Sequence, residues 1–339
     1  MDYRQPKLIA LDWGTSSMRV YLLGDAAEIL DERSRPWGIM YTPEGGFAAA
    51  FHDAIGDWRA SWPDIPAIAA GMIGSRQGWV EAPYCPCPAG ASELAAAMTR
   101  LPTADGVLHI IPGIEQRGAA PNVMRGEETQ TVGALGLNPA LRRRSLLVLP
   151  GTHCKWATII DERIVCFDTF MTGELFAVLR DHSILGRPAA QAGSPASPGW
   201  TAFDRGVGIA RAAGARGLAP NLFLTRSLVL NGDIAAADSL DFLSGLLIGE
   251  ELRVALHSAS EATFALIGEA ALCKRYQRAF AQFGVSDVPR LEDVSPAGVW
   301  RIAAMAGLLG SSPAANVSEP ITCGGTATFT GVRPAMAVE

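Results

Sequence analysis

The sequence predicts an α/β protein whose two halves begin in the same way. Two stretches, IALDWGTSSMRVYLL at 9–23 and LLVLPGTHCKWATII at 146–160, align without a gap, and the alignment superposes Gly14-Thr15 on Gly151-Thr152. Each stretch has the pattern of a strand, a tight polar turn and a second strand. A chain of 339 residues is long enough for two cores, so we predict two α/β domains with a cleft between them.

The first half is predicted to contain three strands followed by helices and strands in alternation. Short apolar runs bounded by turn residues predict strands at 7–12, 18–23, 28–33, 65–70 and 108–111. Apolar residues at helical spacing predict helices at 44–60, 92–99 and 126–137. The last of these ends where Asn138-Pro139 breaks the helical pattern. We therefore assign residues 1–140 to the first domain.

The second half repeats this opening and is richer in helix. Strands are predicted at 146–149, 156–160, 164–170 and 263–267. Helices are predicted at 173–180, 201–216, 235–256, 270–283 and 297–309. We assign residues 141–310 to the second domain. Residues 311–339 mix Pro, Gly, Thr and Ala without a helical period, so we predict a flexible tail.

Composition and charge narrow the class of function. A net charge of −6 and a pI near 5.5 argue against nucleic-acid binding, which normally needs a basic face. No apolar run approaches the roughly 20 residues of a membrane span, so we expect no membrane partner. Six cysteines without paired spacing favour a cytoplasmic location with reduced thiols. The sequence does not fix the oligomeric state, and a homodimer is one option.

The turn of the first hairpin predicts a site for metal-bound phosphate. Asp12 stands at the end of the first strand, and the turn after it consists of Gly14, Thr15, Ser16 and Ser17. A glycine and hydroxyl groups let an anion approach backbone N–H groups closely, and a carboxylate there can hold hydrated Mg²⁺. The alternative is that Asp12 only caps the turn. The duplicated hairpin favours the metal interpretation.

The second hairpin carries the opposite charge. Leu149 takes the position of Asp12, and the turn brings Gly151, Thr152, His153 and Lys155. We expect Lys155 and the Thr152 hydroxyl to bind phosphate oxygens, whereas His153 is either a phosphate donor or a turn residue. Acid in one loop and base in the other suit a metal–phosphate complex. The two hairpins together predict a phosphotransferase.

The segment at 124–130 predicts the catalytic base. Arg125, Glu127 and Glu128 open a helix, where acidic residues also simply complement the helix dipole. The helix follows a strand and loop of the first domain, so its start should face the cleft. A carboxylate there can accept the proton of an attacking alcohol, and Arg125 can bind an acidic substrate. We predict Glu127 as the base, with Glu128 as the close alternative.

Two glycine-containing strand ends complete the predicted site. The loop after the strand at 65–70 predicts a substrate wall made of Gly71, Met72, Ile73, Gly74, Ser75 and Trp79. The alternative for this loop is a plain turn around a packed Trp79. Gly268, where the strand at 263–267 meets a helix, is the predicted wall for the adenine base, although such a glycine also suits a tight turn.

Five segments carry a specific resemblance. They are DWGTSSMR (12–19), AGMIGSRQGWVEAPYCPCP (70–88), MRGEETQ (124–130), LPGTHCKW (149–156) and LSGLLIGEEL (243–252). With these motifs the chain resembles the 2-dehydro-3-deoxygalactonokinase family, which belongs to the sugar kinase, Hsp70 and actin superfamily. The resemblance covers about residues 7–310.

The resemblance implies transfer of the ATP γ-phosphoryl group to the 6-hydroxyl of 2-dehydro-3-deoxy-D-galactonate, a small-molecule sugar acid of galactonate catabolism. It also implies two ribonuclease-H-like domains, the first on the sugar-acid side and the second on the nucleotide side, that close over ATP and Mg²⁺. The first phosphate motif then falls on Asp12–Ser17, the second on Gly151–Lys155 and the adenosine motif around Ile267–Gly268.

The chain departs from the superfamily pattern in two places. The second phosphate loop lacks the acidic residue that many members have there, and the candidate base is a glutamate where many sugar kinases use an aspartate. Two alternatives stay open. One is a kinase for another sugar acid, such as 2-dehydro-3-deoxygluconate. The other is a nucleotide-switched binding protein like actin, which would require a partner-binding domain.

Overall fold

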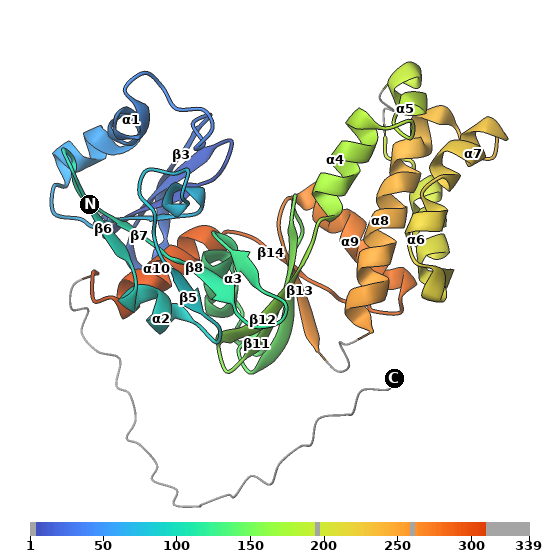
Figure 1. Ribbon diagram of the computed structural model, residues 1–339. Helices are drawn as coiled ribbons and strands as arrows, with labels where there is room; N and C mark the ends of the chain where they lie inside the picture. Colours follow the sequence, from blue (N-terminus) through green and yellow to red (C-terminus); the bar gives the residue numbers. More distant parts are fainter. Residues whose placement is uncertain (1–4, 194–196, 258–261, 310–339) are drawn as a thin grey trace, which may run out of the picture. The chain divides into compact units, whose positions relative to one another are not determined.

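Two β-sheets with the same order of their first strands organise the two halves of the chain (Figure 1). The computed structural model describes residues 5–193, 197–257 and 262–309. These residues belong to one compact unit of mixed α/β structure with three sheets. The predicted tail at 311–339 lies outside the described residues.

The first sheet has six strands in the order β3-β2-β1-β4-β7-β6. Their bounds are β1 Leu8–Trp13, β2 Met18–Leu23, β3 Ile29–Arg35, β4 Ala67–Ala70, β6 Thr99–Thr103 and β7 Gly106–Ile110. Strand β1 pairs antiparallel with β2 and parallel with β4. This central strand is buried on both faces, which explains its nearly continuous apolar sequence before Asp12.

The second sheet repeats this arrangement in the order β12-β11-β10-β13-β14. Its bounds are β10 Arg144–Leu149, β11 Cys154–Ile160, β12 Arg163–Phe170, β13 Thr263–Ile267 and β14 Arg290–Leu291. Strand β10 pairs antiparallel with β11 and parallel with β13, as β1 does with β2 and β4. The predicted repetition of the opening strands is therefore confirmed, and the carboxyl ends of β1 and β10 are where the two polar turns begin.

The helices match most of the predicted helical patterns. The α-helices are α1 Gly46–Ser61, α2 Ala91–Ala96, α3 Glu127–Leu137, α4 Thr172–His182, α5 Arg187–Ala192, α6 Trp200–Ala212, α7 Leu224–Leu230, α8 Ser239–Leu256, α9 Ala270–Gln282 and α10 Val294–Met305. Short 3₁₀ turns are η1 Asp25–Ala27, η2 Met72–Gly74, η3 Pro139–Leu141, η4 Gly214–Arg216, η5 Ala219–Asn221 and η6 Ala236–Asp238. Helices α4 to α9 gather beside the second sheet (Figure 1).

Several elements differ from the prediction. The helix expected at 92–99 ends at Ala96, because Thr99 already begins β6, the edge strand that pairs with β7. The helix expected at 201–216 ends at Ala212, and the one expected at 235–256 begins at Ser239. The short helices α5 and α7 and the third sheet were not predicted. The strands of that sheet are β5 Tyr84–Pro86, β8 Gly113–Gln116 and β9 Asn122–Met124.

Helix α10 follows the second sheet in sequence but packs on first-half elements, chiefly α3, α2 and β1 (Figure 1). Two glycines allow the α3–α10 crossing. A Cβ atom on Gly133 would lie 1.9 Å from the Val294 carbonyl oxygen, and one on Gly298 would lie 1.9 Å from the Thr129 oxygen. The close crossing brings the start of α10 next to β1. The domain boundary near residue 140 stays a prediction.

The two sheets share part of their core. Leu8 and Ala10 on one face of β1 belong to the same buried cluster as Leu147 and Leu149 of β10. The opposite faces of β1 and β10 contribute to two separate clusters. Across the described residues, no helix combines the length and apolar character needed to cross a membrane. The cytoplasmic location and the homodimer stay predictions.

Candidate active site

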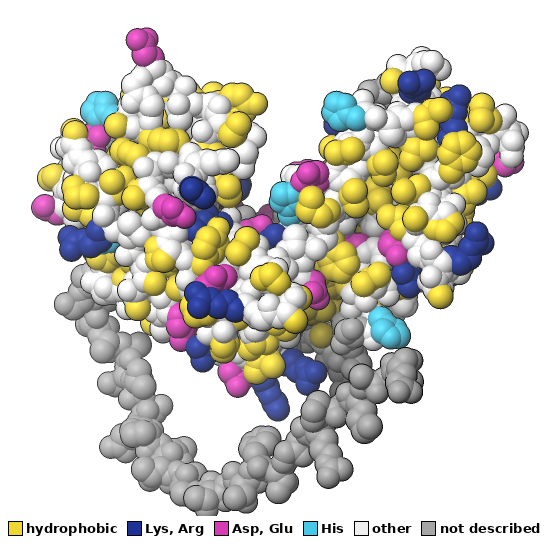
Figure 2. Space-filling view, in the orientation of Figure 1, with side chains coloured by type: hydrophobic (Ala, Val, Ile, Leu, Met, Phe, Trp, Pro, Cys, Tyr) yellow, Lys and Arg dark blue, Asp and Glu magenta, His cyan; other side chains and the backbone are white. Residues whose placement is uncertain are grey.

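A pocket of about 710 Å³ lies where both polar turns and the first turns of α3 and α10 meet. Its walls contain eleven of the predicted site residues, namely Asp12, Gly14, Thr15, Gly71, Met72, Arg125, Glu127, Gly151, Thr152, His153 and Gly268. In the space-filling view, basic, acidic and histidine side chains gather at the floor of the hollow (Figure 2). The sequence positions that come together here lie up to 284 residues apart, since the walls run from Asp12 to Pro296.

The first turn presents Asp12 to the pocket. Its Oδ2 atom accepts a hydrogen bond from Arg19 Nη2 at 2.9 Å and another from Ser295 Oγ at 2.9 Å. The carboxylate is 19% exposed, and among the described residues no donor reaches Oδ1. The turn is closed by the Gly14 N–H, which donates to the Ser17 carbonyl at 2.9 Å. Ser16 and Ser17 are exposed beside the pocket and do not line it.

The second turn is covered by the start of α4. Glu174 N donates to the Thr152 oxygen at 3.0 Å, and the Glu174 carboxylate contacts His153 Nε2 at 2.5 Å. A Cβ atom on Gly173 would lie 2.3 Å from the Gly151 oxygen, so only glycine allows this approach. His153 therefore has a partner that holds it at the turn, which supports the turn-residue interpretation without removing the ring from the pocket wall.

The two hairpins differ by one residue in the turn. The last paired residues are Trp13 and Met18 in the first hairpin but Leu149 and Lys155 in the second. With Asp12 matched to Leu149, six residues separate Asp12 from its paired Arg19, but five separate Leu149 from its paired Lys155. The gap-free alignment of the two hairpins is wrong beyond the turn, because the second hairpin is one residue shorter and Lys155, not Trp156, corresponds to Arg19. Lys155 stands opposite Leu149, whereas Asp12 stands opposite Arg19.

Lys155 is buried at 5% exposure and does not line the pocket. Burial lowers the pKa of its ammonium group, while the charge of Glu127 raises that pKa. Burial in turn raises the pKa of the Glu127 carboxyl, and Lys155 lowers it. The lysine of the second hairpin thus faces the acid at the start of α3, across the two halves of the chain.

The structure separates the two adjacent glutamates. Glu127 lines the pocket, and its Oε2 accepts the Arg125 N–H at 3.0 Å. Glu128 is fully buried outside the pocket wall, where its oxygens accept the Gly126 N–H at 2.7 Å and the Thr129 hydroxyl at 3.0 Å. Burial and the neighbouring Glu127 raise the pKa of Glu128 to about 8. Glu127 is therefore the member of the pair that a substrate can reach.

The loop after β4 contributes only its first two residues to the pocket. Gly71 lies against β1 with a φ of +96°, and a Cβ atom there would lie 2.8 Å from the Trp13 oxygen. Ile73, Gly74 and Ser75 are buried behind it. The Ser75 Oγ has no hydrogen-bond partner in the part of the chain that the structure describes. Trp79 packs with Trp13, Phe47 and Phe51, which agrees with the packed-turn alternative for this residue.

The Arg125 guanidinium lies beneath this loop. Its Nη2 donates to the Ala82 oxygen at 2.8 Å, and its carbon stands 4.2 Å from the centre of the Tyr84 ring. Nε and Nη1 are inaccessible to solvent and have no partner among the described residues. A ligand in the pocket cannot touch these two nitrogens in this arrangement.

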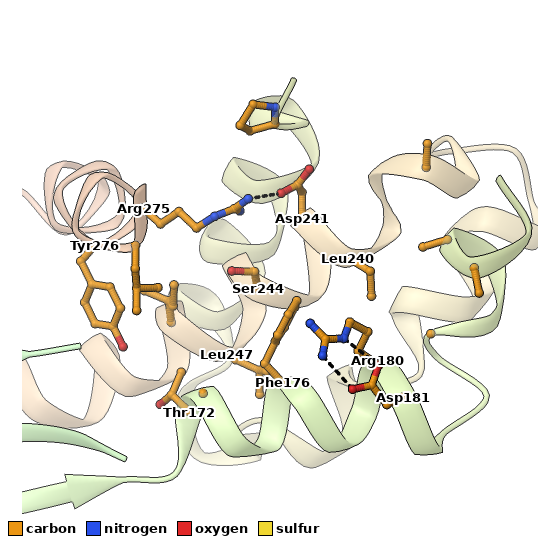
Figure 3. A pocket seen from close by; sticks show the side chains of 18 of the residues that line it. Thr172, Phe176, Arg180, Asp181, Leu240, Asp241, Ser244, Leu247, Arg275 and Tyr276 are labelled. Atoms are coloured by element: carbon orange, nitrogen blue, oxygen red, sulfur yellow. Dashed lines mark hydrogen bonds and ion pairs between the residues drawn. The ribbon is translucent and has the colours of Figure 1, made fainter. Parts of the chain in front are cut away.

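A second cavity of about 700 Å³ adjoins the second turn through Gly151 (Figure 3). Helices α4, α8 and α9 form most of its wall. Phe176, Leu240 and Leu247 give it an apolar surface, and the ion pair of Asp241 with Arg275, at 2.5 Å, lies at one side. The cavity is therefore suited to a flat apolar group with a few polar edges.

The comparisons with known proteins agree with this geometry. A family model described as 2-keto-3-deoxy-galactonokinase matches residues 12–302. The chain belongs to this family. It is 39% identical over 280 residues to a protein of Rhizobium meliloti named probable 2-dehydro-3-deoxygalactonokinase, a match covering 82% of this chain and 90% of the relative. It is 36% identical over 282 residues to the 2-dehydro-3-deoxygalactonokinase of Escherichia coli K12, with the same coverage.

A crystal structure agrees with the same assignment. The chain resembles a candidate 2-dehydro-3-deoxygalactonokinase from Sinorhizobium meliloti with a TM-score of 0.79 at 36% identity, covering 89% of this chain and 99% of that one. The galactonokinase resemblance of the sequence motifs is thereby confirmed. The matched residues include both turns, the start of α3 and the start of α10.

Sequence reasoning missed several residues that line this pocket. Arg19 lines the pocket and sits in the first quoted motif, so its motif position was an available signal. Arg290 lines the pocket and donates from Nη1 to the Gly268 oxygen at 3.3 Å. Ser295 reaches Asp12 from 283 positions away in sequence. No local pattern marks Arg290 or Ser295, because only the sheet pairing and the α3–α10 crossing bring them to the site.

The galactonokinase pocket fits Mg²⁺ through one protein ligand. Within the described residues, no group of three or more His, Cys, Asp or Glu side chains could hold a metal ion. The free Oδ1 of Asp12 supplies a single hard oxygen. This suits Mg²⁺, which keeps several waters and is commonly bound by one or two carboxylates together with substrate phosphates.

Proposed function

We propose that this protein transfers the γ-phosphoryl group of ATP to the 6-hydroxyl of 2-dehydro-3-deoxy-D-galactonate, a step of galactonate catabolism. Family membership and the two named relatives support the substrate and the reaction. The observation that carries the mechanism is that Glu127 and both polar turns line one pocket. A general base and two phosphate-binding turns therefore meet where the acceptor and the γ-phosphate have to meet.

The phosphates of ATP are proposed to lie between the two turns. Backbone N–H groups near Gly14 and Gly151, with the Thr15 and Thr152 hydroxyls, are available as donors in a pocket that also holds the cations of Arg19 and Arg290. Mg²⁺ bound through Asp12 would neutralise phosphate charge when present. Buried Lys155 adds positive potential from behind the turn.

Glu127 is proposed as the base. As the 6-hydroxyl oxygen bonds to the γ-phosphorus, the bond from phosphorus to the bridging oxygen of ADP breaks, and the hydroxyl proton passes to the Glu127 carboxylate. A base works best when its pKa lies near the working pH, and burial raises the pKa of Glu127 toward that range. Glu128 is held neutral by its pKa of about 8 and is not reached by solvent.

The nucleoside is proposed to occupy the second cavity. This cavity shares Gly151 with the pocket, so the triphosphate can pass from one to the other around the second turn. Phe176 and Leu247 offer apolar contacts to a base, and Ser244 and Arg275 offer polar ones. Gly268 then borders the phosphates more closely than the adenine.

The two sheets are proposed to be the cores of two ribonuclease-H-like domains that close on the substrates. The shared strand order around β1 and β10 supports this assignment. The sugar acid is proposed to lie between Gly71, Met72 and Glu127, on the first-half side of the pocket. Closure would exclude water from the reacting phosphate and suppress ATP hydrolysis.

The test measures ADP formation with and without 2-dehydro-3-deoxy-galactonate, in wild type and in Glu127→Gln. We expect the sugar acid to stimulate ADP formation, and the variant to lose about 10²- to 10⁴-fold in kcat while binding ATP normally. Glu44→Gln, which makes the same change at an exposed position, is the matched control. Absence of stimulation would refute the substrate, and an active Glu127→Gln would refute the base.

A further inference from the structure

Glu251 is the most completely hydrogen-bonded buried carboxyl group among the described residues. It lies on α8 at 2% exposure, within the LSGLLIGEEL motif whose Ser244 and Leu247 line the second cavity. Trp156 Nε1 donates to its Oε1 at 2.6 Å, and the Tyr276 hydroxyl donates to its Oε2 at 2.7 Å. The Thr172 hydroxyl also donates to Oε2. The Cys154 thiol is a fourth hydrogen-bonding neighbour.

The partners of Glu251 come from three different elements. Cys154 and Trp156 belong to β11, Thr172 begins α4 and Tyr276 belongs to α9. All four can donate a hydrogen bond, and an ionised carboxylate, whose two oxygens are acceptors only, can accept from each of them. Burial raises the pKa of Glu251, and the four hydrogen bonds oppose that effect. Glu251 therefore ties α8 to three other elements through one group.

The hydrogen bonds between Glu251 and β11 fix the direction in which the Lys155 side chain points. Successive side chains of a strand point to opposite faces of the sheet, so Lys155 points away from the face that holds Cys154 and Trp156. With both of these residues bonded to Glu251, β11 cannot rotate or slip by one residue without breaking the bonds. Lys155 is thereby kept on the side that faces Glu127.

The hydrogen bond from Thr172 to Glu251 fixes the start of α4, which lies over the second turn. The next two residues, Gly173 and Glu174, contact Gly151, Thr152 and His153. Thr172 and Tyr276 also line the second cavity, at the same end of it (Figure 3). One carboxylate thus connects the phosphate turn, the lysine behind it and the wall of the cavity.

We propose that Glu251 is a positioning residue for ATP: it touches no substrate, but it fixes the second phosphate turn, Lys155 and the end wall of the second cavity in the arrangement that binds the nucleotide. The inference rests on the proposed function of the second turn and the second cavity. It predicts that loss of Glu251 weakens nucleotide binding selectively and leaves sugar-acid binding on the other side of the pocket intact.

The test compares wild type with Glu251→Gln by calorimetric titration with a non-hydrolysable ATP analogue and by KM values for ATP and the sugar acid. In glutamine one carboxylate oxygen becomes an N–H₂ group, so either Trp156 Nε1 loses its acceptor or the Thr172 and Tyr276 hydroxyls must reverse their hydrogen bonds and accept. We expect the Kd and KM for ATP to rise about tenfold, with the KM for the sugar acid unchanged within about twofold. Trp156→Phe removes one donor without changing the carboxylate, and we expect a rise of about two- to threefold in the same constants.

Ser145→Ala is the control for a general loss of stability. Ser145 is buried on β10 and donates to the Leu141 oxygen at 2.8 Å, away from both the pocket and the second cavity. We expect this variant to lose thermal stability with unchanged ATP affinity. Unchanged ATP affinity in a folded Glu251→Gln, or equal rises in both KM values, would overturn the proposal. If Glu251→Gln does not fold, Trp156→Phe decides by the same criteria.

A failure of the proposed function would give a different result from a failure of the proposal for Glu251. The calorimetric titration contains no sugar acid, so its outcome does not depend on whether the protein phosphorylates one. A wild type that binds the ATP analogue but is not stimulated by the sugar acid would refute the substrate and leave the role of Glu251 open to the same binding comparison.

Discussion

The hairpin formed by β1 and β2 carries its charges at the pocket surface, whereas the hairpin formed by β10 and β11 buries its lysine. In the first, Asp12 stands opposite Arg19 on the paired strand, and the two form an ion pair of 2.9 Å. In the second, Lys155 stands opposite Leu149, so no acid on the paired strand neutralises it. The electrostatic partner of Lys155 is Glu127, which belongs to the first half.

The difference shows how one topology can serve two tasks. The Asp12 carboxylate is 19% exposed, and no donor among the described residues reaches its Oδ1, so this oxygen stays available to the pocket. A buried lysine with no acid on the paired strand interacts instead with Glu127 from the other half of the chain. The second hairpin is one residue shorter between its matched positions, which shifts its second strand and places Lys155 where the first hairpin has Arg19.

Asp12→Asn is expected to have the largest effect on activity, and it tests the contrast between the two hairpins directly. The amide keeps a hydrogen-bond acceptor for Ser295 but removes the charge that holds Arg19 and would hold Mg²⁺. We expect kcat to fall about 10²- to 10³-fold and the Mg²⁺ concentration for half-maximal rate to rise. Rates measured across a magnesium titration test this. Full activity with an unchanged magnesium requirement would contradict a metal role for the first hairpin.

A smaller effect is expected in Lys155→Met. Lys155 lowers the pKa of Glu127, so its removal should raise that pKa further. The base must be ionised to accept a proton, and activity is lost as the pH falls through its pKa. The acid limb of the kcat/KM profile should therefore move to higher pH, with about a tenfold loss near neutrality.

The control for this prediction is Lys7→Met, which removes a lysine at the far end of β1 from the pocket. Its profile should superpose on that of wild type. An acid limb that stays in place in Lys155→Met would mean that Lys155 does not lower the pKa of Glu127. The different placement of charge in the two hairpins would then have no effect on activity.

Local patterns were sufficient to predict the duplicated strands and most helices. Each hairpin is a continuous apolar run with a turn of Gly and hydroxyl residues, so the signal lies within about 15 residues. The same holds for the position of Glu127 at a helix start. Edge strand β6 and helices α5 and α7 have no strong pattern of their own, because contacts with distant elements stabilise them.

Long-range contacts decide the parts of the site that the sequence could not predict. The sequence left Glu127 and Glu128 nearly equivalent, and only burial distinguishes them. Ser295 reaches Asp12 because Gly133 and Gly298 let α3 and α10 cross closely. The placement of Arg125 beneath the loop after β4 also depends on the third sheet, whose short strands the sequence did not reveal.

The last prediction concerns stability rather than catalysis and contrasts the buried carboxyl groups of the two halves. Glu251 has four hydrogen-bonding partners, whereas Glu128 has two and lies beside another acid. The pKa of Glu128 is about 8 in the folded protein against an ordinary value of 4.5. Between these values the folded state holds a proton that the unfolded state releases, so stability falls as the pH rises, by at most about 1.4 kcal/mol per pH unit.

Glu128→Gln should remove this dependence, because a neutral amide resembles the protonated carboxyl group. We expect the melting temperature of the variant to exceed that of wild type by a margin that widens from pH 5 to pH 8 and then stops growing. Glu251→Gln should instead melt below wild type, since the amide has one acceptor oxygen in place of the two that Trp156, Thr172 and Tyr276 use. Calorimetric melting curves across this range, with Glu44→Gln as the surface control, distinguish the two cases. Parallel curves for wild type and Glu128→Gln would show that Glu128 is ionised in the folded protein.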